Sequence, residues 1–311
     1  MNRCLITYQP CGDALYSADG LALLSKSLKN LQNLPFSAEE QRREAILHAE
    51  KLSIQGVQPK LGAKLNVRQE RFELSDTHST FILKPQNRDF LQLPENEAVT
   101  MRMAAVLGIE TPLSGLIKSE DDSLTYFIQR FDRLSKSKKL PVEDFAQLTN
   151  SNREKKYDSS MERVADVLEL FCSFPMIEKI KLFRLVLFNF LIGNEDAHLK
   201  NFSLITQNGK VQLSPAYDLL NTTIILRGAN IEEMALPLAG KKRKLTSDLL
   251  IRYYGQDRLK LSLKTIEQVL LDIKNAVPLW KNLLEICFLS ADLKKKYVML
   301  LDKRLKILGL F

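Results

Sequence analysis

Two carboxylates and an amide near the middle of the chain have the spacing of a phosphate-transfer site. Asp196 and Asn201 lie in the run GNEDAHLKN at residues 193–201, and Asp218 ends the run SPAYD at residues 214–218. Kinases use a carboxylate that orients the acceptor hydroxyl, followed by an amide and a second carboxylate that bind magnesium. The spacing therefore predicts phosphoryl transfer from ATP, with Mg²⁺ as the metal.

The sequence on either side of this loop predicts the elements that would position it. Residues 183–192 are apolar nearly all round, which is typical of a buried helix. Gly193 and Asn194 favour the end of that helix, because both tolerate the left-handed conformation of a C-terminal cap. Residues 202–206 and 210–214 alternate on either side of an Asn-Gly pair, which predicts a hairpin that returns Asp218 toward Asn201.

The same residue types also occur in loops that do no chemistry. An Asp and an Asn at this spacing arise by chance in many chains, so the buried helix and the hairpin carry the functional interpretation. His198 is one of only three histidines, and we expect it to brace the loop by hydrogen bonding rather than to carry a proton.

Several motifs, in this order, resemble those of the bacterial HipA family of serine/threonine kinase toxins. They are SIQGVQPKL at 53–61, FILKP at 81–85, YFIQRFDR at 126–133, GNEDAHLKN at 193–201, and MALPL at 234–238 before Gly240-Lys241-Lys242. The resemblance covers most of residues 50–250. It implies an α+β, two-lobed, protein-kinase-like fold with a small mixed N-terminal lobe and a mostly helical C-terminal lobe.

We expect the two lobes to divide the chain into residues 1–130 and 131–311. The first would hold an N-terminal extension, a phosphate loop and a strand lysine, and the second the catalytic loop and the metal-binding Asp. Helical spacing of apolar residues predicts helices at 97–107, 177–192, 265–275 and 291–307. Residues 37–50 are also helix-like, with Ser37 as the N-terminal cap.

Carried over residue by residue, the resemblance gives each polar group a role. Asp196 becomes the catalytic base, and Asn201 and Asp218 become the metal ligands. Lys84 ends a predicted strand and would reach the α- and β-phosphates as a point charge. Glu97 is its expected partner, with Glu95 as the competing choice.

The resemblance also implies a set of ATP-binding residues. Segment 53–60 corresponds to a phosphate loop whose backbone amides and lysine hold phosphate oxygens, and residues 129–131 correspond to the hinge that contacts adenine. The expected ATP-binding residues are Gln55, Gly56, Val57, Gln58, Pro59, Lys60, Lys84, Gln129, Arg130, Phe131, His198, Leu199, Lys200, Asn201, Tyr217 and Asp218.

Ser53 has an expected regulatory role. In the family, a serine at this position is autophosphorylated, which ejects the phosphate loop and switches the kinase off. A dianionic group there would be repelled by the phosphates of ATP. Some relatives carry a second serine two residues further on, but Gln55 stands there in this chain. We therefore expect Ser53 alone to carry the modification.

The expected substrate and partners also follow from the resemblance. The substrate would be a protein of the translation machinery, an aminoacyl-tRNA synthetase. The short stretch before Ser53 is similar to that of compact HipT-like members, so a separate HipS-like protein and a HipB-like DNA-binding antitoxin are expected partners. DNA would be bound only through the antitoxin.

Two other function classes compete with this one. A small-molecule or lipid phosphotransferase is the alternative, because such enzymes share the Asp and Asn loop with a later Asp. A binding module without catalysis is disfavoured by the intact set of Lys84, Asp196, Asn201 and Asp218.

Composition and net charge indicate what kind of partner the protein would bind. Its 311 residues are 45% hydrophobic and carry a net charge of +8. The basic clusters at 135–139, 241–244 and 294–296 lack interleaved aromatic residues, so we expect them to steer an acidic protein rather than to grip nucleic acid.

The four cysteines show no paired spacing, which disfavours metal-thiolate and disulfide interpretations. No signal peptide or membrane-spanning run is visible, so the expected location is the bacterial cytoplasm without membrane association, with translocation into a host cell as the alternative.

Overall fold

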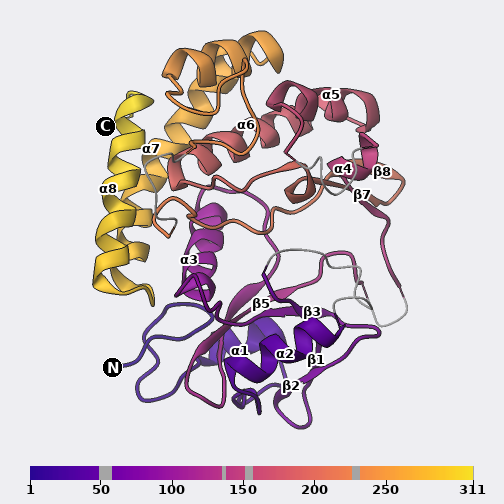
Figure 1. The fold of residues 1–311 in the computed structure, drawn as a ribbon, viewed down its shortest axis with the longest axis vertical. Coiled ribbons are helices and arrows are strands. Elements are labelled where there is room, and N and C mark those ends of the chain that lie inside the picture. The colour runs from indigo at the N-terminus through magenta and orange to yellow at the C-terminus, as the bar shows by residue number, and fades with distance from the viewer. Residues whose placement is uncertain (49–57, 135–137, 151–156, 226–231, 311) are drawn as a thin grey trace. The chain divides into compact units, whose positions relative to one another are not determined.

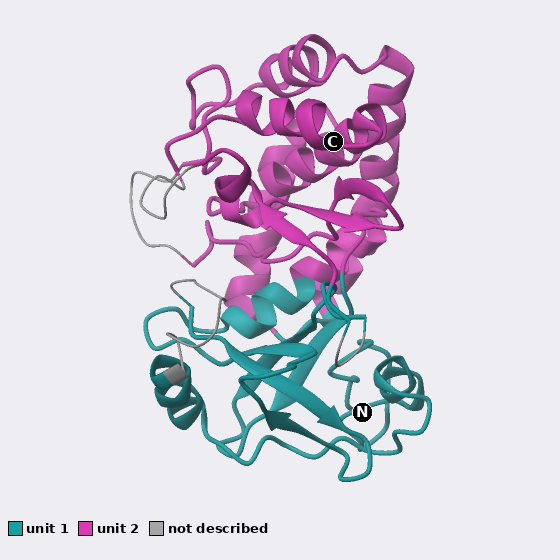
Figure 2. Cartoon of the chain, turned by 90° about the vertical axis from the view of Figure 1, so that its right-hand side faces the viewer, with its two compact units in different colours: residues 1–99, 112–139, 286–288 teal, residues 100–111, 140–285, 289–311 magenta. Residues whose placement is uncertain are grey.

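The structure is a computed structural model that describes residues 1–48, 58–134, 138–150, 157–225 and 232–310 (Figure 1). Its chain forms two compact units (Figure 2). Unit 1 contains residues 1–99, 112–139 and 286–288, and unit 2 contains residues 100–111, 140–285 and 289–311. The expected division after residue 130 falls inside unit 1, and the assignment of functions to two lobes stays a prediction.

A five-stranded antiparallel sheet is the centre of unit 1. Its strands are β1 (Leu61–Asn66), β2 (Arg71–Leu74), β3 (Phe81–Lys84), β4 (Ser114–Lys118) and β5 (Leu124–Gln129), in the order β2-β1-β3-β5-β4. Phe72 packs against Phe81 and Phe127 with ring centroids 5.0 Å and 5.4 Å apart. Aromatic side chains therefore fill one face of the sheet, as their strand propensity favours.

Helices α1 (Ala18–Leu24) and α2 (Ala38–His48) also belong to unit 1. Ser37 Oγ accepts a hydrogen bond from the Glu40 N–H at 3.3 Å, and the Glu40 carboxylate accepts one from the Ser37 N–H at 2.8 Å. This reciprocal cap satisfies donors that a helix start leaves unpaired, and the expected cap at Ser37 is confirmed. Helix α3 (Leu93–Val106) begins four residues before the expected start and contributes residues to both units.

Unit 2 is mainly helical. Its helices are α4 (Phe145–Leu148), α5 (Met161–Phe171), α6 (Pro175–Ile192), the 3₁₀ turn η2 (Leu199–Asn201), the π-helix η3 (Asp248–Arg258), α7 (Leu263–Ile286) and α8 (Ala291–Ile307). A small antiparallel sheet joins β6 (Val142–Asp144), β7 (Ser203–Gln207) and β8 (Lys210–Leu213) in that order.

The expected α+β class and the helices and hairpin around the site are confirmed. Every side chain from Leu185 to Ile192 in α6 is buried, as the apolar run predicted. Helix α7 is much longer than the expected 265–275, because it continues through Pro278. Within the part of the chain that the structure describes, no helix has the length and apolarity needed to cross a membrane.

Candidate active site

Gly193 ends α6 and starts the candidate catalytic loop, residues 193–201. Its backbone is left-handed, with φ 78° and ψ 37°, and its N–H donates to the carbonyls of Asn189 and Phe190. A Cβ here would lie 2.5 Å from Leu300 Cδ2 and 2.7 Å from Thr223 Oγ1. Only glycine fits both the conformation and the space, so the chain leaves the buried helix in one fixed direction and the loop follows from there.

Asn194 anchors the loop beneath Asp196. The Asn194 side chain is 2% exposed, and its Nδ2 donates to Asn189 Oδ1 at 3.2 Å. Its Oδ1 accepts from the Asp196 N–H at 3.2 Å, and the Asp196 carbonyl accepts from the His198 N–H at 2.8 Å. The backbone of Asp196 is thus held on both sides, while its carboxylate stays exposed.

His198 and Asn201 brace each other across the 3₁₀ turn η2. His198 Nδ1 accepts from the Lys200 N–H at 3.3 Å, and Asn201 Oδ1 accepts from the His198 N–H at 3.2 Å. The histidine is buried and uses its δ nitrogen as an acceptor. These are contacts of a bracing residue and keep the Asn201 amide in place.

Tyr217 fastens the end of the hairpin to the loop. Its hydroxyl donates to the Lys200 carbonyl at 2.9 Å and lies 2.5 Å from Ser203 Oγ. Burial raises the pKa of Tyr217, and the hydrogen bond with Ser203 only partly opposes the rise, so the phenol stays protonated. Tyr217 is the residue before Asp218, and Lys200 is the residue before Asn201. This hydrogen bond therefore holds the end of the hairpin against the loop.

Asn201 and Asp218 have the chemistry of magnesium ligands. Both side chains are half-buried, and Asp218 has a left-handed backbone with φ 54°. The described residues contain no group of three or more His, Cys, Asp and Glu side chains able to hold a metal. Magnesium is commonly held by one or two oxygen side chains together with substrate phosphates and waters, so this pair fits it.

The Tyr157 side chain reaches the carboxylate of Asp196 and was not foreseen from the sequence. Its hydroxyl donates to Asp196 Oδ1, and its ring stands edge-on to the His198 ring with centroids 5.0 Å apart. Burial, followed by the contact with Asp196, raises the pKa of Tyr157. The available signal was modest: Tyr157 is the single aromatic residue in the polar stretch 147–158.

A second unforeseen network connects the start of the loop with α8. The Glu195 N–H donates to Thr222 Oγ1 at 2.8 Å, and Thr223 Oγ1 lies 3.1 Å from the Gly193 carbonyl and contacts Glu195 Oε1. The Arg304 guanidinium donates to the carbonyl of Phe190 and stacks over its ring at 5.0 Å.

This Arg304 contact places a cation at the end of α6, where the helix dipole favours one. Burial raises the pKa of Glu195, while the Thr223 hydroxyl and Arg304 oppose the rise. Burial lowers the pKa of Arg304.

In unit 1, Lys84 and Glu97 form a buried ion pair. Lys84 Nζ lies 2.5 Å from Glu97 Oε1 and 5.5 Å from the centroid of the Tyr126 ring. Glu95, the competing choice, instead accepts hydrogen bonds from Gln86 Nε2 at 2.8 Å and 3.0 Å. Burial raises the pKa of Glu95 despite those bonds. The strand lysine thus has a helix carboxylate beside it.

The expected adenine hinge lies at the end of β5. The N–H groups of Gln129 and Arg130 donate within unit 1, to the carbonyls of Leu113 and Thr80, each at 2.8 Å. The Arg130 guanidinium forms two hydrogen bonds with Asp132, at 2.9 Å and 2.8 Å. These two N–H donors are therefore engaged in the sheet, and an adenine contact through this segment has to use its other groups.

The expected phosphate loop is covered only in part. Ser53, Gln55, Gly56 and Val57 lie outside the described residues. Gln58, Pro59 and Lys60 are half-buried and lead into β1. Gln58 Nε2 is buried and lacks a hydrogen-bond partner among the residues that the structure describes. A buried amide N–H without a hydrogen-bond partner costs free energy, so the Gln58 amide is suited to donate a hydrogen bond to an acceptor atom of a ligand.

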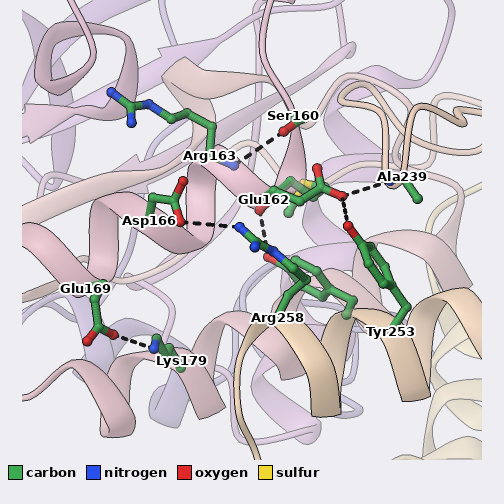
Figure 3. Close-up of polar contacts among 11 residues, drawn as sticks. Ser160, Glu162, Arg163, Asp166, Glu169, Lys179, Ala239, Tyr253 and Arg258 are labelled. Atoms are coloured by element: carbon green, nitrogen blue, oxygen red, sulfur yellow. Dashed lines mark hydrogen bonds and ion pairs between the residues drawn. The ribbon is translucent and has the colours of Figure 1, made fainter.

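The MALPL segment packs beside the start of α5. The Pro237 carbonyl accepts from the Met161 N–H at 3.0 Å. Glu162 accepts from the Ala239 N–H at 2.8 Å and from the Tyr253 hydroxyl at 3.1 Å (Figure 3). Burial raises the pKa of Glu162, but the hydrogen bonds outweigh it and lower the pKa overall. This network joins α5, the MALPL segment and η3 within unit 2, and it includes none of the candidate catalytic groups.

Comparison with known sequences gives matches over most of the chain. Residues 52–280 match the family model described as HipA-like C-terminal domain. A Haemophilus influenzae protein, provisionally described as a kinase, is 31% identical over 261 residues, which are 78% of this chain and 75% of that protein. The serine/threonine-protein kinase toxin HipA of Shewanella oneidensis is 30% identical over 190 residues, 55% of this chain and 43% of that protein.

Comparison with solved structures identifies the fold. A chain in the complex of HipA, HipB and operator DNA from the Shewanella oneidensis MR-1 toxin–antitoxin system superposes with a TM-score of 0.69 and 23% identity, covering 91% of this chain and 73% of that one. The Helicobacter pylori proinflammatory kinase CtkA gives 0.58 and 17%, covering 84% and 92%. The fold is therefore kinase-like.

Proposed function

This chain belongs to the family of HipA-like kinases, and we propose that it transfers the γ-phosphate of ATP to a serine or threonine hydroxyl of a protein. One observation carries the proposal. The buried helix α6 ends at Gly193 and presents Asp196 and Asn201 on one hydrogen-bonded loop, and Tyr217, the residue before Asp218, hydrogen-bonds to that loop.

In this proposal Asp196 accepts the proton of the acceptor hydroxyl. Its exposed carboxylate suits that role, because an acceptor has to reach it from solvent. Asn194 fixes the backbone of Asp196, and His198 fixes Asn201. Magnesium bound by Asn201 and Asp218 would neutralise charge on the phosphates.

The contacts in unit 1 support ATP as the donor. Lys84, held by Glu97, is a buried cation of the kind that pairs with phosphates in kinases. Gln58 offers a buried amide donor at the end of the expected phosphate loop. The assignment of all the residues of that loop, Gln55 to Lys60, to ATP binding stays a prediction.

Labelled ATP tests the proposed activity. Incubation of the purified chain with γ-labelled ATP, Mg²⁺ and a dephosphorylated bacterial extract should label a protein on serine or threonine. Asp196→Ala and Asp218→Ala should abolish the label while leaving the circular dichroism spectrum unchanged. Normal labelling by either variant would remove its residue from the assigned role.

We also propose that the kinase autophosphorylates at Ser53. Tandem mass spectrometry after incubation with ATP should find the phosphate on Ser53, and Ser53→Ala should remove it. A phosphate that persists on another residue would assign the autophosphorylation site to that residue instead of Ser53.

The biological setting we propose is a toxin–antitoxin system. The substrate would be an aminoacyl-tRNA synthetase, and the partners a HipS-like protein and a HipB-like antitoxin that carries the contact with DNA. The presence of HipB and operator DNA with the structurally similar Shewanella protein supports this setting. Identification of the labelled extract protein and of the neighbouring reading frames tests it.

The small-molecule or lipid phosphotransferase remains the second candidate. It shares the Asp, Asn and Asp arrangement, and the same incubation separates the two. Label that appears in the small-molecule or lipid fraction, with none in protein, would favour the second candidate.

A further inference from the structure

The Asp196 carboxylate already holds a hydroxyl donor from within the chain. Among the described residues, the phenol of Tyr157 is the one side chain that hydrogen-bonds this carboxylate. The two residues are 39 positions apart, and both belong to unit 2. A kinase base accepts its proton from the acceptor hydroxyl in the same way.

We infer that Tyr157 is an internal stand-in for the acceptor hydroxyl, and that it competes with the protein substrate for Asp196. This inference rests on the proposed kinase function. The position of the Tyr157 hydroxyl then marks the subsite that a serine or threonine of the substrate has to enter, beside the buried ring of His198.

The surroundings of Tyr157 fit a displaceable occupant rather than a core residue. The side chain is 40% exposed, and its ring leans edge-on against His198 with an interplanar angle of 85°. Such an edge contact orients the ring at modest energy. Because its pKa is raised, the phenol remains a neutral donor at physiological pH and keeps the contact with Asp196.

Competition makes a different prediction from a supporting role. If Tyr157 only oriented Asp196, loss of its hydroxyl would lower the maximal rate of transfer. If it competes, loss of the hydroxyl lowers the substrate concentration needed for half-maximal rate and leaves the affinity for ATP unchanged. The two roles therefore separate in KM against kcat.

Tyr157→Phe removes the hydroxyl and keeps the ring against His198. Tyr253→Phe is the matched control, because it removes a hydroxyl that hydrogen-bonds a carboxylate of unit 2, that of Glu162, which is not one of the candidate catalytic groups (Figure 3). Initial rates with γ-labelled ATP are measured across dilutions of the dephosphorylated bacterial extract. The KM for ATP and the thermal midpoint are measured for each variant.

For Tyr157→Phe we expect the half-saturating extract concentration to fall on the order of tenfold, the effect of losing one competing hydrogen bond to a charged group in a partly exposed site. The KM for ATP should stay within about twofold, since Tyr157 is not assigned to the ATP site. Tyr253→Phe should match the wild type.

An unchanged half-saturating concentration, or a lower maximal rate with a normal thermal midpoint, would overturn the inference while leaving the kinase intact. If neither wild type nor Tyr157→Phe labels any extract protein, the proposed function itself fails, and the inference fails with it. An inactive wild type beside an active Tyr157→Phe would support both.

Discussion

Lys84 and Glu97 leave only 2% and 1% of their side chains exposed, so their ion pair is shielded from water. Removal of either residue takes a counter-charge away from the other in this buried site. We therefore expect Glu97→Ala to lower the free energy of unfolding by about 3–5 kcal/mol and to abolish phosphoryl transfer. Chemical denaturation and the labelled-ATP assay measure the two effects.

Two variants show whether this loss comes from burial. Arg43→Ala breaks a surface ion pair with Glu39, whose side chains are 71% and 50% exposed, and should cost no more than about 0.5 kcal/mol. The double variant Lys84→Met/Glu97→Leu should regain most of the lost stability yet stay inactive, because it restores packing without a phosphate-binding charge. A double variant as unstable as Glu97→Ala would contradict this account.

Glu195 should make stability depend on pH. Burial raises its pKa above the ordinary value of 4.5, so the folded protein holds the proton more tightly than the unfolded chain. Its stabilising contribution is then fully present below about pH 4.5 and is lost as pH rises through the raised pKa.

Glu195→Gln stays neutral and still accepts the hydrogen bond of Thr223 through its amide oxygen. We expect the free energy of unfolding of this variant, relative to wild type, to increase between about pH 4.5 and pH 7. Urea unfolding at several pH values tests the sign. A difference that does not vary with pH would mean that Glu195 titrates normally.

At the scale of elements, the end of α6 depends on glycine. Gly193 and Gly209 both have left-handed backbones, with φ 78° and 73°, but a Cβ on Gly209 would meet no heavy atom within 4 Å. Gly209→Ala should therefore cost about 1–2 kcal/mol from conformation alone. Gly193→Ala should cost about 1–3 kcal/mol more, because its Cβ would press against Leu300 and Thr223.

Chemical denaturation of both alanine variants measures the difference. Gly193→Ala should also slow phosphoryl transfer, since the clash displaces the loop that carries Asp196, whereas Gly209→Ala should not. Equal losses of stability would show that the space around Gly193 is not limiting.

Elements with strong local patterns could be predicted from the sequence. The apolar run before Gly193 became the buried end of α6, and the expected helix 291–307 matches α8 at both ends. The long extent of α7 could not be predicted, because its packing overrides Pro278, which normally interrupts a helix.

The candidate site was predicted in part for the same reason. Loop residues such as Asp196 and Asn201 share one short segment, so spacing identifies them. Tyr157 contacts Asp196, which is 39 positions away in the sequence, and Arg304 contacts Phe190, which is 114 positions away. Only tertiary packing brings these residues together. A local pattern carries no information about contacts at such separations.

At the scale of the whole molecule, the net charge of +8 does not by itself make a DNA-binding surface. Lys242 lies 3.3 Å from Glu232, Lys296 lies 2.6 Å from Asp292, and Lys294 donates to the carbonyl of Glu285 at 2.9 Å. In the basic clusters at 241–244 and 294–296, Lys242 and Lys296 thus each have an acidic partner, and Lys294 has a carbonyl acceptor. Residues 135–137 of the third cluster lie outside the described residues.

We therefore expect the isolated chain to bind duplex DNA only non-specifically, with a Kd of about 1–100 μM at physiological salt. Filter binding over a salt series measures this. Nanomolar binding with a steep salt dependence would contradict the proposal that DNA is reached only through an antitoxin.

The contact between Arg304 and the carbonyl of Phe190 also has a consequence for biosynthesis. A ribosome releases residues 190–201 long before it has made Arg304, which lies 114 positions after Phe190. Domains generally acquire their structure as units when their residues become available. An unfinished copy of the chain thus carries residues 193–201 without the cation at the end of α6, so we expect this loop to reach its final position only after Arg304 has been made and has packed against Phe190.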